Sequence, residues 1–258
     1  MIKNQPHNSL INNVKRLVTI YKMSTKYISK ALESMDYFPN TITSTYYNRE
    51  GQRVPRVTEI LSRTIHSDGL MYWANSLGFR GIRYREALNN AADMGTEAHA
   101  AIEKYLKEKL ETTDNIPFLA FMEWYNIITK DYKLSFEVIY SEHSLVCDWF
   151  GGTLDLLVRI DERLFLVDFK TSNHVTFNYF LQMAAYRYML KTVERINIDG
   201  IIVLQLNKLE PEFNEYMLDF RNLAHIDFIN RCEETFLSLV YAYYNITRVE
   251  ERFKTVFK

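Results

Sequence analysis

The sequence predicts an α/β domain whose mixed central β-sheet is flanked by helices. Two observations favour this fold class. Segments with helical and strand patterning follow one another in the order helices, three strands, helix, strand and helix, as in a layered domain with no Rossmann repeat. The 258 residues are 47% hydrophobic and 24% charged, so the chain is long and apolar enough to bury a substantial core.

Residues 1–45 are predicted to form a basic helical appendage, followed by a single domain over residues 46–258. Six of the 31 basic residues and none of the 32 acidic residues lie within the first 32 positions. Apolar residues at helical spacing between Ile11 and Tyr21 favour a helix packed on the core. The segment is also compatible with a nucleic-acid-facing arm, a solvated helical face, or a transit peptide that would direct the chain to mitochondria.

A hairpin and several helices are expected before the first long strand. Residues 46–55 have the pattern of a short β-hairpin with its turn at Glu50-Gly51. Thr58 is predicted to cap the helix that follows. Helical patterning continues over residues 69–110, with an interruption at residues 78–81 that contains two glycines.

The second half of the chain carries the strands of the predicted sheet. Short apolar runs bounded by polar turn residues predict strands, and longer runs with apolar residues at helical spacing predict helices. The predicted strands cover residues 134–139, 153–160, 164–171 and 200–206, and the predicted helices cover residues 178–191 and 223–244.

Composition excludes several classes of protein. No apolar run approaches the ~18 residues that a membrane span needs, and residues 1–10 are too polar for a signal peptide. Cys147 and Cys232 lie 85 positions apart, which excludes a disulfide framework and any zinc or iron–sulfur centre held by cysteines. A reducing compartment is therefore expected. The formal net charge of −1 excludes a generic polycationic binder.

Two acidic residues and a lysine are expected on one face of a β-hairpin within residues 153–171. If the turn centres on Asp161-Glu162, Asp155 and Asp168 lie opposite each other, with Cβ atoms about 5 Å apart. Lys170 is two residues beyond Asp168 and projects from the same face. The opposite face is predicted to be a continuous apolar surface of Leu154, Leu156, Val158, Phe165, Val167 and Phe169.

This arrangement of charges admits two interpretations. Directly opposed carboxylates repel, and a divalent cation with oxygen ligands would offset that repulsion. Alternatively, the register differs, and both acids reach solvent or pair with Lys170. His99 shares a helix face with apolar residues and points inward, where it is either a satisfied core residue or a ligand. Gln182 and Tyr186, four residues apart on the next helix, share a face, which alone is more typical of core residues.

Four short motifs in this order resemble those of the PD-(D/E)XK nuclease superfamily. They are GTEAH at residues 95–99, GGTLD at 151–155, VDFKTS at 167–172 and QMAAY at 182–186. The resemblance covers residues 46–206 and points to the RecB-like branch, which includes the mitochondrial genome maintenance exonuclease and phage- or virus-type exonucleases. VPRVTEIL at residues 54–61 is similar to a segment of phage-type members, in which Ser is more usual where Arg56 stands. The resemblance implies a restriction-endonuclease-like core.

The resemblance implies a metal-dependent catalytic centre. Asp155, Asp168, His99 and the backbone carbonyl of Phe169 would bind Mg²⁺ or Mn²⁺. Oxygen ligands favour Mg²⁺, and an imidazole ligand favours Mn²⁺ as an activator. Lys170 would be the catalytic lysine, which orients and helps to deprotonate the attacking water and stabilises negative charge on the phosphate.

Three further residues gain supporting roles from the resemblance. Gln182 and Tyr186 match a QxxxY motif that contacts DNA or braces the catalytic centre. Glu137 resembles an acidic position on the preceding strand and would provide acidic support. Iron–sulfur relatives of the CRISPR-associated and AddB types hold their cluster with four cysteines, so no iron–sulfur cluster is expected in a chain with two.

The DNA-binding surface has to be basic locally, because the chain as a whole is not. Arg83 and Arg85 flank Tyr84, and cations interleaved with an aromatic ring suit single-stranded DNA, whose bases stack and whose phosphates attract arginine. Any one of these arginines can equally be a solvated surface charge. The candidate DNA-binding residues are Tyr186 and the arginines Arg53, Arg56, Arg80, Arg83, Arg85 and Arg187.

The expected function is that of a divalent-metal-dependent deoxyribonuclease, an exonuclease on single-stranded DNA or DNA ends in recombination, repair or viral genome processing. DNA is the expected partner, and a recombination or replication protein is a second candidate. The cytoplasm of a bacterium or a virus-infected cell is the expected location, without membrane association. Two alternatives stay open: a structure-specific endonuclease on the same scaffold, and a catalytically degenerate DNA-binding protein.

Overall fold

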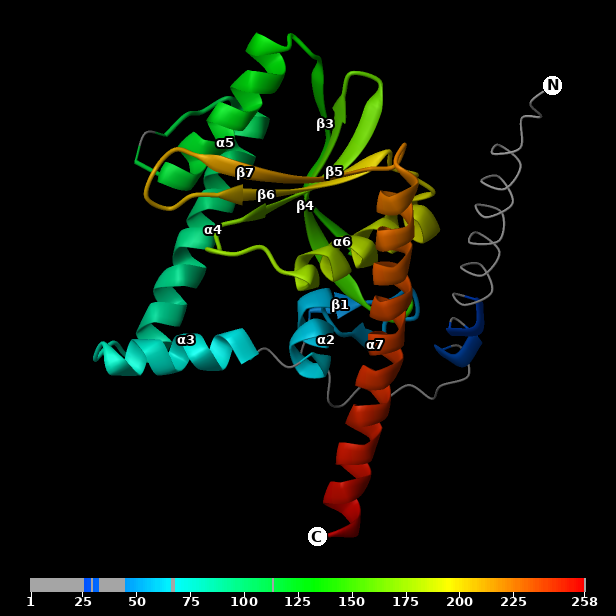
Figure 1. The fold of residues 1–258 in the computed structure, drawn as a ribbon. Helices are drawn as coiled ribbons and strands as arrows, with labels where there is room; N and C mark the ends of the chain where they lie inside the picture. The colour runs from blue at the N-terminus through cyan, green and yellow to red at the C-terminus, as the bar shows by residue number, and fades with distance from the viewer. Residues whose placement is uncertain (1–25, 29, 33–44, 66–67, 113, 258) are drawn as a thin grey trace, which may run out of the picture.

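The computed structural model describes residues 26–28, 30–32, 45–65, 68–112 and 114–257. Its centre is a five-stranded sheet in the order β3-β4-β5-β6-β7 (Figure 1). β5 and β6 are parallel and every other neighbouring pair is antiparallel, so the sheet is mixed, as predicted. The strands are β3 (Phe136–Val146), β4 (Gly151–Ile160), β5 (Arg163–Lys170), β6 (Gly200–Leu206) and β7 (Phe213–Asp219).

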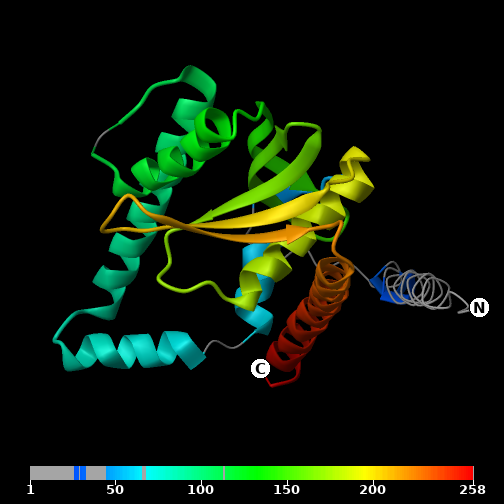
Figure 2. The ribbon, with the colours of Figure 1, turned by 45° about the horizontal axis from the view of Figure 1, so that its top comes forward.

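Helices cover both faces of this sheet and form two apolar cores with it. The α-helices between residues 57 and 256 are α2 (Val57–Thr64), α3 (Asp68–Phe79), α4 (Tyr84–Glu108), α5 (Ile116–Asn126), α6 (Phe177–Met189) and α7 (Leu223–Val256). α4 and α5 pack on one face, and α2, α6 and α7 pack on the other (Figure 1). α3 leads into α4 and lies away from the sheet (Figure 2). The predicted α/β class is confirmed.

The central strands are buried on both faces, which explains why their sequences are continuous apolar runs. Six consecutive residues of β5, Leu164 to Phe169, are buried, and β6 is buried over its whole length. Each large apolar side chain buried in this way stabilises the fold by about 1.5–3 kcal/mol. Asp155 in β4 and Asp168 in β5 are the buried acids of these strands. A carboxylate buried there costs free energy unless a partner compensates it, so both residues need compensating contacts.

The predicted hairpin is confirmed. β1 (Tyr46–Tyr47) pairs with β2 (Arg53–Val54) around Gly51, whose φ of 75° is one that glycine adopts readily. Tyr46 packs against the start of β4, where a Cβ at Gly151 would lie 2.8 Å from Tyr46 Cγ. The first glycine of the GGTLD motif therefore lets the hairpin dock on the sheet.

Several element boundaries differ from the prediction. α2 begins at Val57 and its N-cap residue makes no side-chain capping bond, so the prediction that Thr58 caps this helix is wrong. β3 continues to Val146 and α7 to Val256, beyond the predicted ends at residues 139 and 244. α5 and β7 are absent from the prediction. α5 is apolar on most sides and β7 is mostly exposed, so neither has a clear periodicity.

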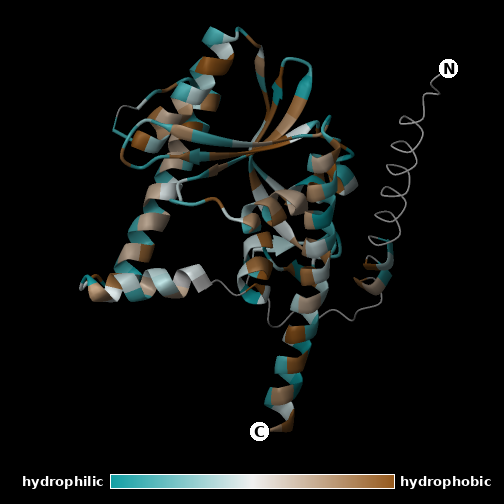
Figure 3. Cartoon of the chain, viewed as in Figure 1, coloured by the Kyte–Doolittle hydropathy of each residue, from teal (hydrophilic) through white to brown (hydrophobic). Residues whose placement is uncertain are grey.

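Part of the predicted N-terminal appendage is described. Residues 26–28 and 30–32 are helical, Leu32 is buried, and Ile28 packs against the same core as α6 and α7. The other residues up to 44 lie outside the described residues, so the domain boundary stays a prediction. α7 carries hydrophobic and hydrophilic residues in alternation along its length (Figure 3). None of the helices among the described residues is both long and apolar enough to cross a membrane.

Candidate metal centre

The β4–β5 hairpin has the predicted register. Ile160 pairs with Arg163, and the ladder continues to Leu156 and Val167. It ends there, one position before Asp155 and Asp168, so these two acids do not form the predicted backbone pair. Asp155 Oδ2 instead accepts a 2.8 Å hydrogen bond from the backbone N–H of Phe169. The side chain of Asp155 thus supplies the acceptor for this backbone N–H of β5, beyond the end of the β4–β5 ladder.

Side-chain alternation in β4 changes at this point. Leu156 packs with the α4–α5 core, whereas Leu154, predicted to share its face, packs with the α6–α7 core. The prediction for Leu154 is therefore wrong, although the other five residues of the predicted apolar face do pack together. Across the β3–β4 ladder, Glu142 has a φ of 49°, which is uncommon for a residue other than glycine. Irregular backbone of this kind recurs at functional sites, where the surrounding structure compensates its cost.

Asp168 and Lys170 project from one face of β5, as predicted. Asp168 is 1% exposed, and Lys170 Nζ donates a 2.9 Å hydrogen bond to its Oδ1. Nζ also lies 2.8 Å from Oδ2, but Oδ2 is buried and accepts no hydrogen bond among the described residues. The charge of Lys170 therefore compensates this oxygen without a hydrogen bond, and a bound cation would add a second positive partner.

Gln182 and Tyr186 of α6 extend this network behind the lysine. Lys170 Nζ donates to Gln182 Oε1 at 3.3 Å, and Gln182 Nε2 donates to the hydroxyl of Tyr186, also at 3.3 Å. Tyr186 lies against the second glycine of the GGTLD motif, because a Cβ at Gly152 would be 2.7 Å from Tyr186 Cε1. The structure thus brings GGTLD, DFK and QMAAY together.

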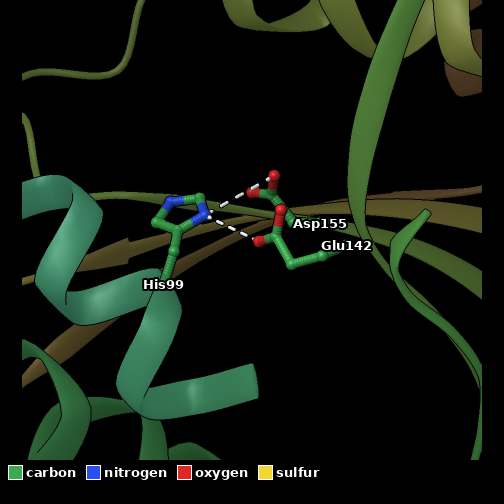
Figure 4. Close-up of side chains that lie close together, drawn as sticks. All are labelled: His99, Glu142 and Asp155. Carbon is green, nitrogen blue, oxygen red and sulfur yellow. Dashed lines mark hydrogen bonds and ion pairs between the residues drawn. The ribbon is translucent and has the colours of Figure 1, made fainter. Parts of the chain in front are cut away.

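His99 lies on α4, which packs on the opposite face of the sheet from α6. Its side chain points toward Asp155 and Glu142 (Figure 4). Its Nε2 lies 3.1 Å from the carbonyl oxygen of Phe169. Its Nδ1 lies 3.3 Å from Glu142 Oε1 and 3.6 Å from Asp155 Oδ1. Three of the predicted metal ligands, His99, Asp155 and the Phe169 carbonyl, therefore lie close together.

Glu142 belongs to the cluster but is absent from the sequence-based prediction, which named Glu137 on the same strand. The side chain of Glu137 is 65% exposed and pairs with Arg159 at 3.2 Å, so the structure does not bring it to the site. Glu142 lies opposite Asp155, since its neighbours Ser141 and His143 pair with Leu156 and Leu154. Extending the predicted strand beyond residue 139 and pairing it with 153–160 could have found Glu142.

The electrostatics of the cluster favour a cation. Burial raises the pKa of Asp155, and burial raises the pKa of Asp168 to about 6 despite the opposing charge of Lys170. Burial alone would lower the pKa of His99, but the hydrogen bond to Glu142 and the charge of Asp155 outweigh it and raise this pKa to about 9. The acids are thus harder to ionise than usual, and the imidazole is easier to protonate.

The residues present fit a divalent cation. Single ligand atoms of His99, Glu142 and Asp155 lie within 4.8 Å of one another. Carboxylate and carbonyl oxygens suit Mg²⁺, and an imidazole beside them suits Mn²⁺ equally well. A group of histidine and acidic residues in this structure can therefore hold a metal ion.

The predicted DNA-binding arginines lie in three places. Arg187 donates to Glu233 Oε2 at 2.9 Å and to Asn230 Oδ1 at 3.0 Å, which joins α6 to α7. This partly buried ion pair gives Arg187 a structural role, and its role in DNA binding stays a prediction. Arg53 lies in β2, where its Nε donates to the Tyr47 hydroxyl, and Arg56 is exposed at the start of α2. The remaining three, Arg80, Arg83 and Arg85, are exposed where α3 meets α4.

Comparisons with known proteins found only distant similarity. No protein-family model matches the chain, and no curated protein matches it. The solved structure of SSO0001 is similar at 10% identity over 86% of each chain, with a TM-score of 0.32. The structure of LHK-Exo in complex with dAMP is similar at 13% identity, covering 61% of this chain and 85% of that chain, with a TM-score of 0.30. The functional assignment therefore depends on the geometry of the site.

Proposed function

We propose that the protein is a divalent-metal-dependent deoxyribonuclease that hydrolyses phosphodiester bonds at the His99–Asp155–Asp168–Lys170 cluster. The observation that carries this proposal is the chain of contacts that joins these four residues: His99 lies 3.6 Å from Asp155, Asp155 accepts from the Phe169 N–H, and Lys170 pairs with Asp168 on either side of Phe169. Burying carboxylates costs several kcal/mol per ion unless opposite charge compensates them. A cation held by Asp155, Asp168, His99 and the Phe169 carbonyl would provide that compensation.

The arrangement suits hydrolysis of a phosphate diester. A bound divalent metal supplies Lewis-acid activation of the phosphate and lowers the pKa of a coordinated water. Lys170 adds a positive charge. Burial would lower its pKa, but the charges of Asp168 and Asp155 outweigh burial and raise it, so Lys170 is an ammonium group at neutral pH. In this form Lys170 stabilises negative charge on the phosphate and orients the attacking water.

Gln182 and Tyr186 act on the reaction through Lys170. The amide oxygen of Gln182 accepts a hydrogen bond from Nζ, and its amide nitrogen donates to the Tyr186 hydroxyl. Both side chains are buried, so this chain of hydrogen bonds holds the lysine in one position. They are positioning residues in this proposal, and neither has to touch the substrate.

In this proposal, the single strand of DNA approaches the metal centre along the surface where α3 meets α4. Arg80, Arg83 and Arg85 are exposed there, beside the exposed side chains of Tyr72 and Phe79. Cations and exposed aromatic rings together bind single-stranded DNA through its phosphates and bases. Arg85 precedes His99 by 14 residues of one helix, or about 20 Å at 1.5 Å per residue. Several nucleotides of a single strand would span that distance, so we propose an exonuclease on single strands or DNA ends.

A Mn²⁺-dependent assay with matched substrates tests the proposal. Linear single strands labelled at the 5′ or the 3′ end are incubated beside a covalently closed single-stranded circle. The proposal predicts Mn²⁺-dependent cleavage of the linear strands and an intact circle. Cleavage of the circle at a similar rate would mean an endonuclease. Binding of DNA without cleavage of any substrate, with Mg²⁺ or Mn²⁺, would mean a degenerate DNA-binding protein.

A further inference from the structure

A cavity of about 510 Å³, lined by both polar and apolar surface, lies next to Lys170 at the carboxyl ends of the parallel strands β5 and β6. The carboxyl ends of parallel strands are where open α/β sheets bind ligands. Residue 171, which follows Lys170 directly, is part of the cavity wall. The polar residues that line the cavity are Thr171, Ser172, Asn173, Gln205, Asn207 and Asn214.

The cavity is connected to the catalytic lysine through the register of the sheet. Lys170 of β5 lies beside Gln205 of β6, and Gln205 lies beside Asn214 of β7. These three residues form a row across the sheet. With strands about 4.8 Å apart, the row spans roughly 10 Å, which is comparable with the length of one nucleotide. A phosphate at Lys170 would therefore place the adjoining nucleoside within reach of the cavity.

The carboxamide groups of the cavity are held in fixed orientations. Gln205 is 8% exposed, and its Nε2 donates a 2.7 Å hydrogen bond to the carbonyl oxygen of Ser172. Its Oε1 accepts a 3.2 Å hydrogen bond from Asn214 Nδ2. A carboxamide has two N–H donors and an oxygen with two acceptor positions, so these bonds leave further donors and acceptors for a ligand. The orientations are set before any ligand enters.

The chemistry of the lining favours a nucleobase over an anion. Lys208 is the only charged residue of the lining, and the other polar groups are carboxamides, hydroxyls and backbone. A carboxamide presents a donor and an acceptor side by side, which matches the edge of a base. Leu209, which lines the cavity and is 84% exposed, supplies apolar surface for a face of the ring. Protein pockets read unstacked bases by this combination of edge hydrogen bonds and apolar contact.

We infer that this cavity is a subsite for one nucleobase of the nucleotide whose phosphate lies at the metal centre. The inference rests on the proposed function. The subsite would give the protein a preference among bases. The carboxamide of Asn214 is held by Gln205. A base whose edge does not match it would leave polar groups without hydrogen bonds. Asn214 is a specificity-determining residue in this account.

Binding of nucleotides, measured without cleavage, tests the subsite. The Ca²⁺-loaded protein is titrated with each deoxynucleoside 5′- and 3′-monophosphate and with the matching base-free deoxyribose phosphate. For the wild-type protein, the best nucleotide is expected to bind about tenfold more tightly than its base-free counterpart, the value of one good pair of edge hydrogen bonds. Asn214→Leu, which keeps the size of the side chain and removes its polar atoms, is expected to reduce this ratio to within about twofold. Asn173→Ala is a second variant should Asn214→Leu not fold.

The control is Asn245→Ala on α7, a half-buried residue whose amide donates to the Tyr241 carbonyl of its own helix. This variant is expected to keep the wild-type ratio. Equal binding of every nucleotide and its base-free phosphate, or a ratio that survives both cavity variants, would overturn the subsite and leave the proposed function standing. If no phosphate ligand binds in a Ca²⁺-dependent manner, the proposed function fails and the subsite with it.

Discussion

The backbone N–H of Phe169 donates a 2.8 Å hydrogen bond to Asp155 Oδ2, so a side chain of one strand supplies the acceptor for its neighbour. The carbonyl of the same residue lies 3.1 Å from His99 Nε2. Asp155 therefore has two roles: it fixes the position of a carbonyl that the proposal assigns to the metal, and it offers its second oxygen to the same ion. The two roles can be separated by substitution.

Asp155→Asn and Asp155→Ala are expected to differ in stability but not in activity. Both remove the charge, so both should abolish metal-dependent cleavage. Asn keeps an acceptor for the Phe169 N–H, whereas Ala leaves a buried donor unsatisfied at a cost of about 1–3 kcal/mol. Urea unfolding in EDTA should show a loss of stability for Asp155→Ala alone. Asp155→Asn should keep its stability, because burial already raises the pKa of Asp155 and so disfavours the charge that Asn removes. Equal stability of the two variants would contradict the anchoring role.

Metal affinity is expected to increase with pH. The pKa of His99 is raised to about 9, so the imidazole is protonated at neutral pH and has to lose that proton to bind metal. Affinity should therefore rise by about tenfold per pH unit, for one displaced proton, between pH 6.5 and 9. The stabilisation from protonated His99 is present below its unfolded pKa of about 6.5, and it is lost as the pH rises through about 9 in the folded chain. The gain in Tm on adding Mn²⁺ should accordingly grow over the same window.

Glu142→Gln tests the origin of that shift. The hydrogen bond from His99 to Glu142 and the charge of Glu142 both raise the pKa of His99. The variant should lower this pKa, measured by NMR titration in EDTA, and move the increase in metal affinity to lower pH. Glu137→Gln is the control, because the side chain of Glu137 is exposed and pairs with Arg159. An unchanged His99 pKa in Glu142→Gln would show that Glu142 does not act on the imidazole.

Gly152→Ala is expected to reduce both stability and cleavage, whereas Gly95→Ala is expected to reduce neither. A Cβ at Gly152 would lie 2.7 Å from Tyr186 Cε1, so the ring has to move and its hydrogen bond with Gln182 is lost. Such overpacking costs about 1–3 kcal/mol, measured by urea unfolding, and should reduce cleavage through Lys170. A Cβ at Gly95 would lie 3.5 Å from Thr171 Oγ1, an ordinary contact. Replacing that helical glycine should be neutral or stabilising by up to about 1 kcal/mol. Equal effects would argue against the close approach at Gly152.

Arg187→Ala is expected to reduce stability and not to weaken DNA binding selectively. Glu233 is 2% exposed, and removing its ion-pair partner should cost about 3–5 kcal/mol. The comparison is Arg231→Ala, which breaks an exposed pair with Asp227 on the same helix α7 and should cost less than about 1 kcal/mol. A stable Arg187→Ala variant with reduced DNA affinity would support the DNA-binding role that the sequence alone suggested.

Much of the fold and part of the site could be predicted from the sequence. Placing the turn at Asp161-Glu162 was sufficient for the register, because a hairpin's register follows from its turn, and the register brings Asp155 near Asp168. Glu142 could not be found in this way. It lies on β3, outside this hairpin and beyond the predicted end of its strand at residue 139.

Contacts between residues far apart in the sequence could not be predicted. Arg187 follows the QxxxY motif directly, but its partner Glu233 comes from a helix 46 residues later, and no local pattern shows that pairing. The cavity at Gln205 and Asn214 is also non-local, because it depends on pairing with β7, a strand whose mostly exposed residues show no clear alternation. Tertiary pairing, rather than local propensity, decided each of these cases.

The most direct test of the proposed function is the rate of Mn²⁺-dependent nucleotide release from linear single-stranded DNA by the wild-type protein, Asp168→Ala and Lys170→Ala. Asp227→Ala and Lys107→Ala, which each remove one member of an exposed i,i+4 ion pair, are the matched controls. We expect Asp168→Ala and Lys170→Ala each to lose at least about 10²-fold in rate while they keep the wild-type far-UV circular dichroism, and the controls to stay active. Cleavage by Asp168→Ala or Lys170→Ala at close to the wild-type rate would contradict the assignment of the site.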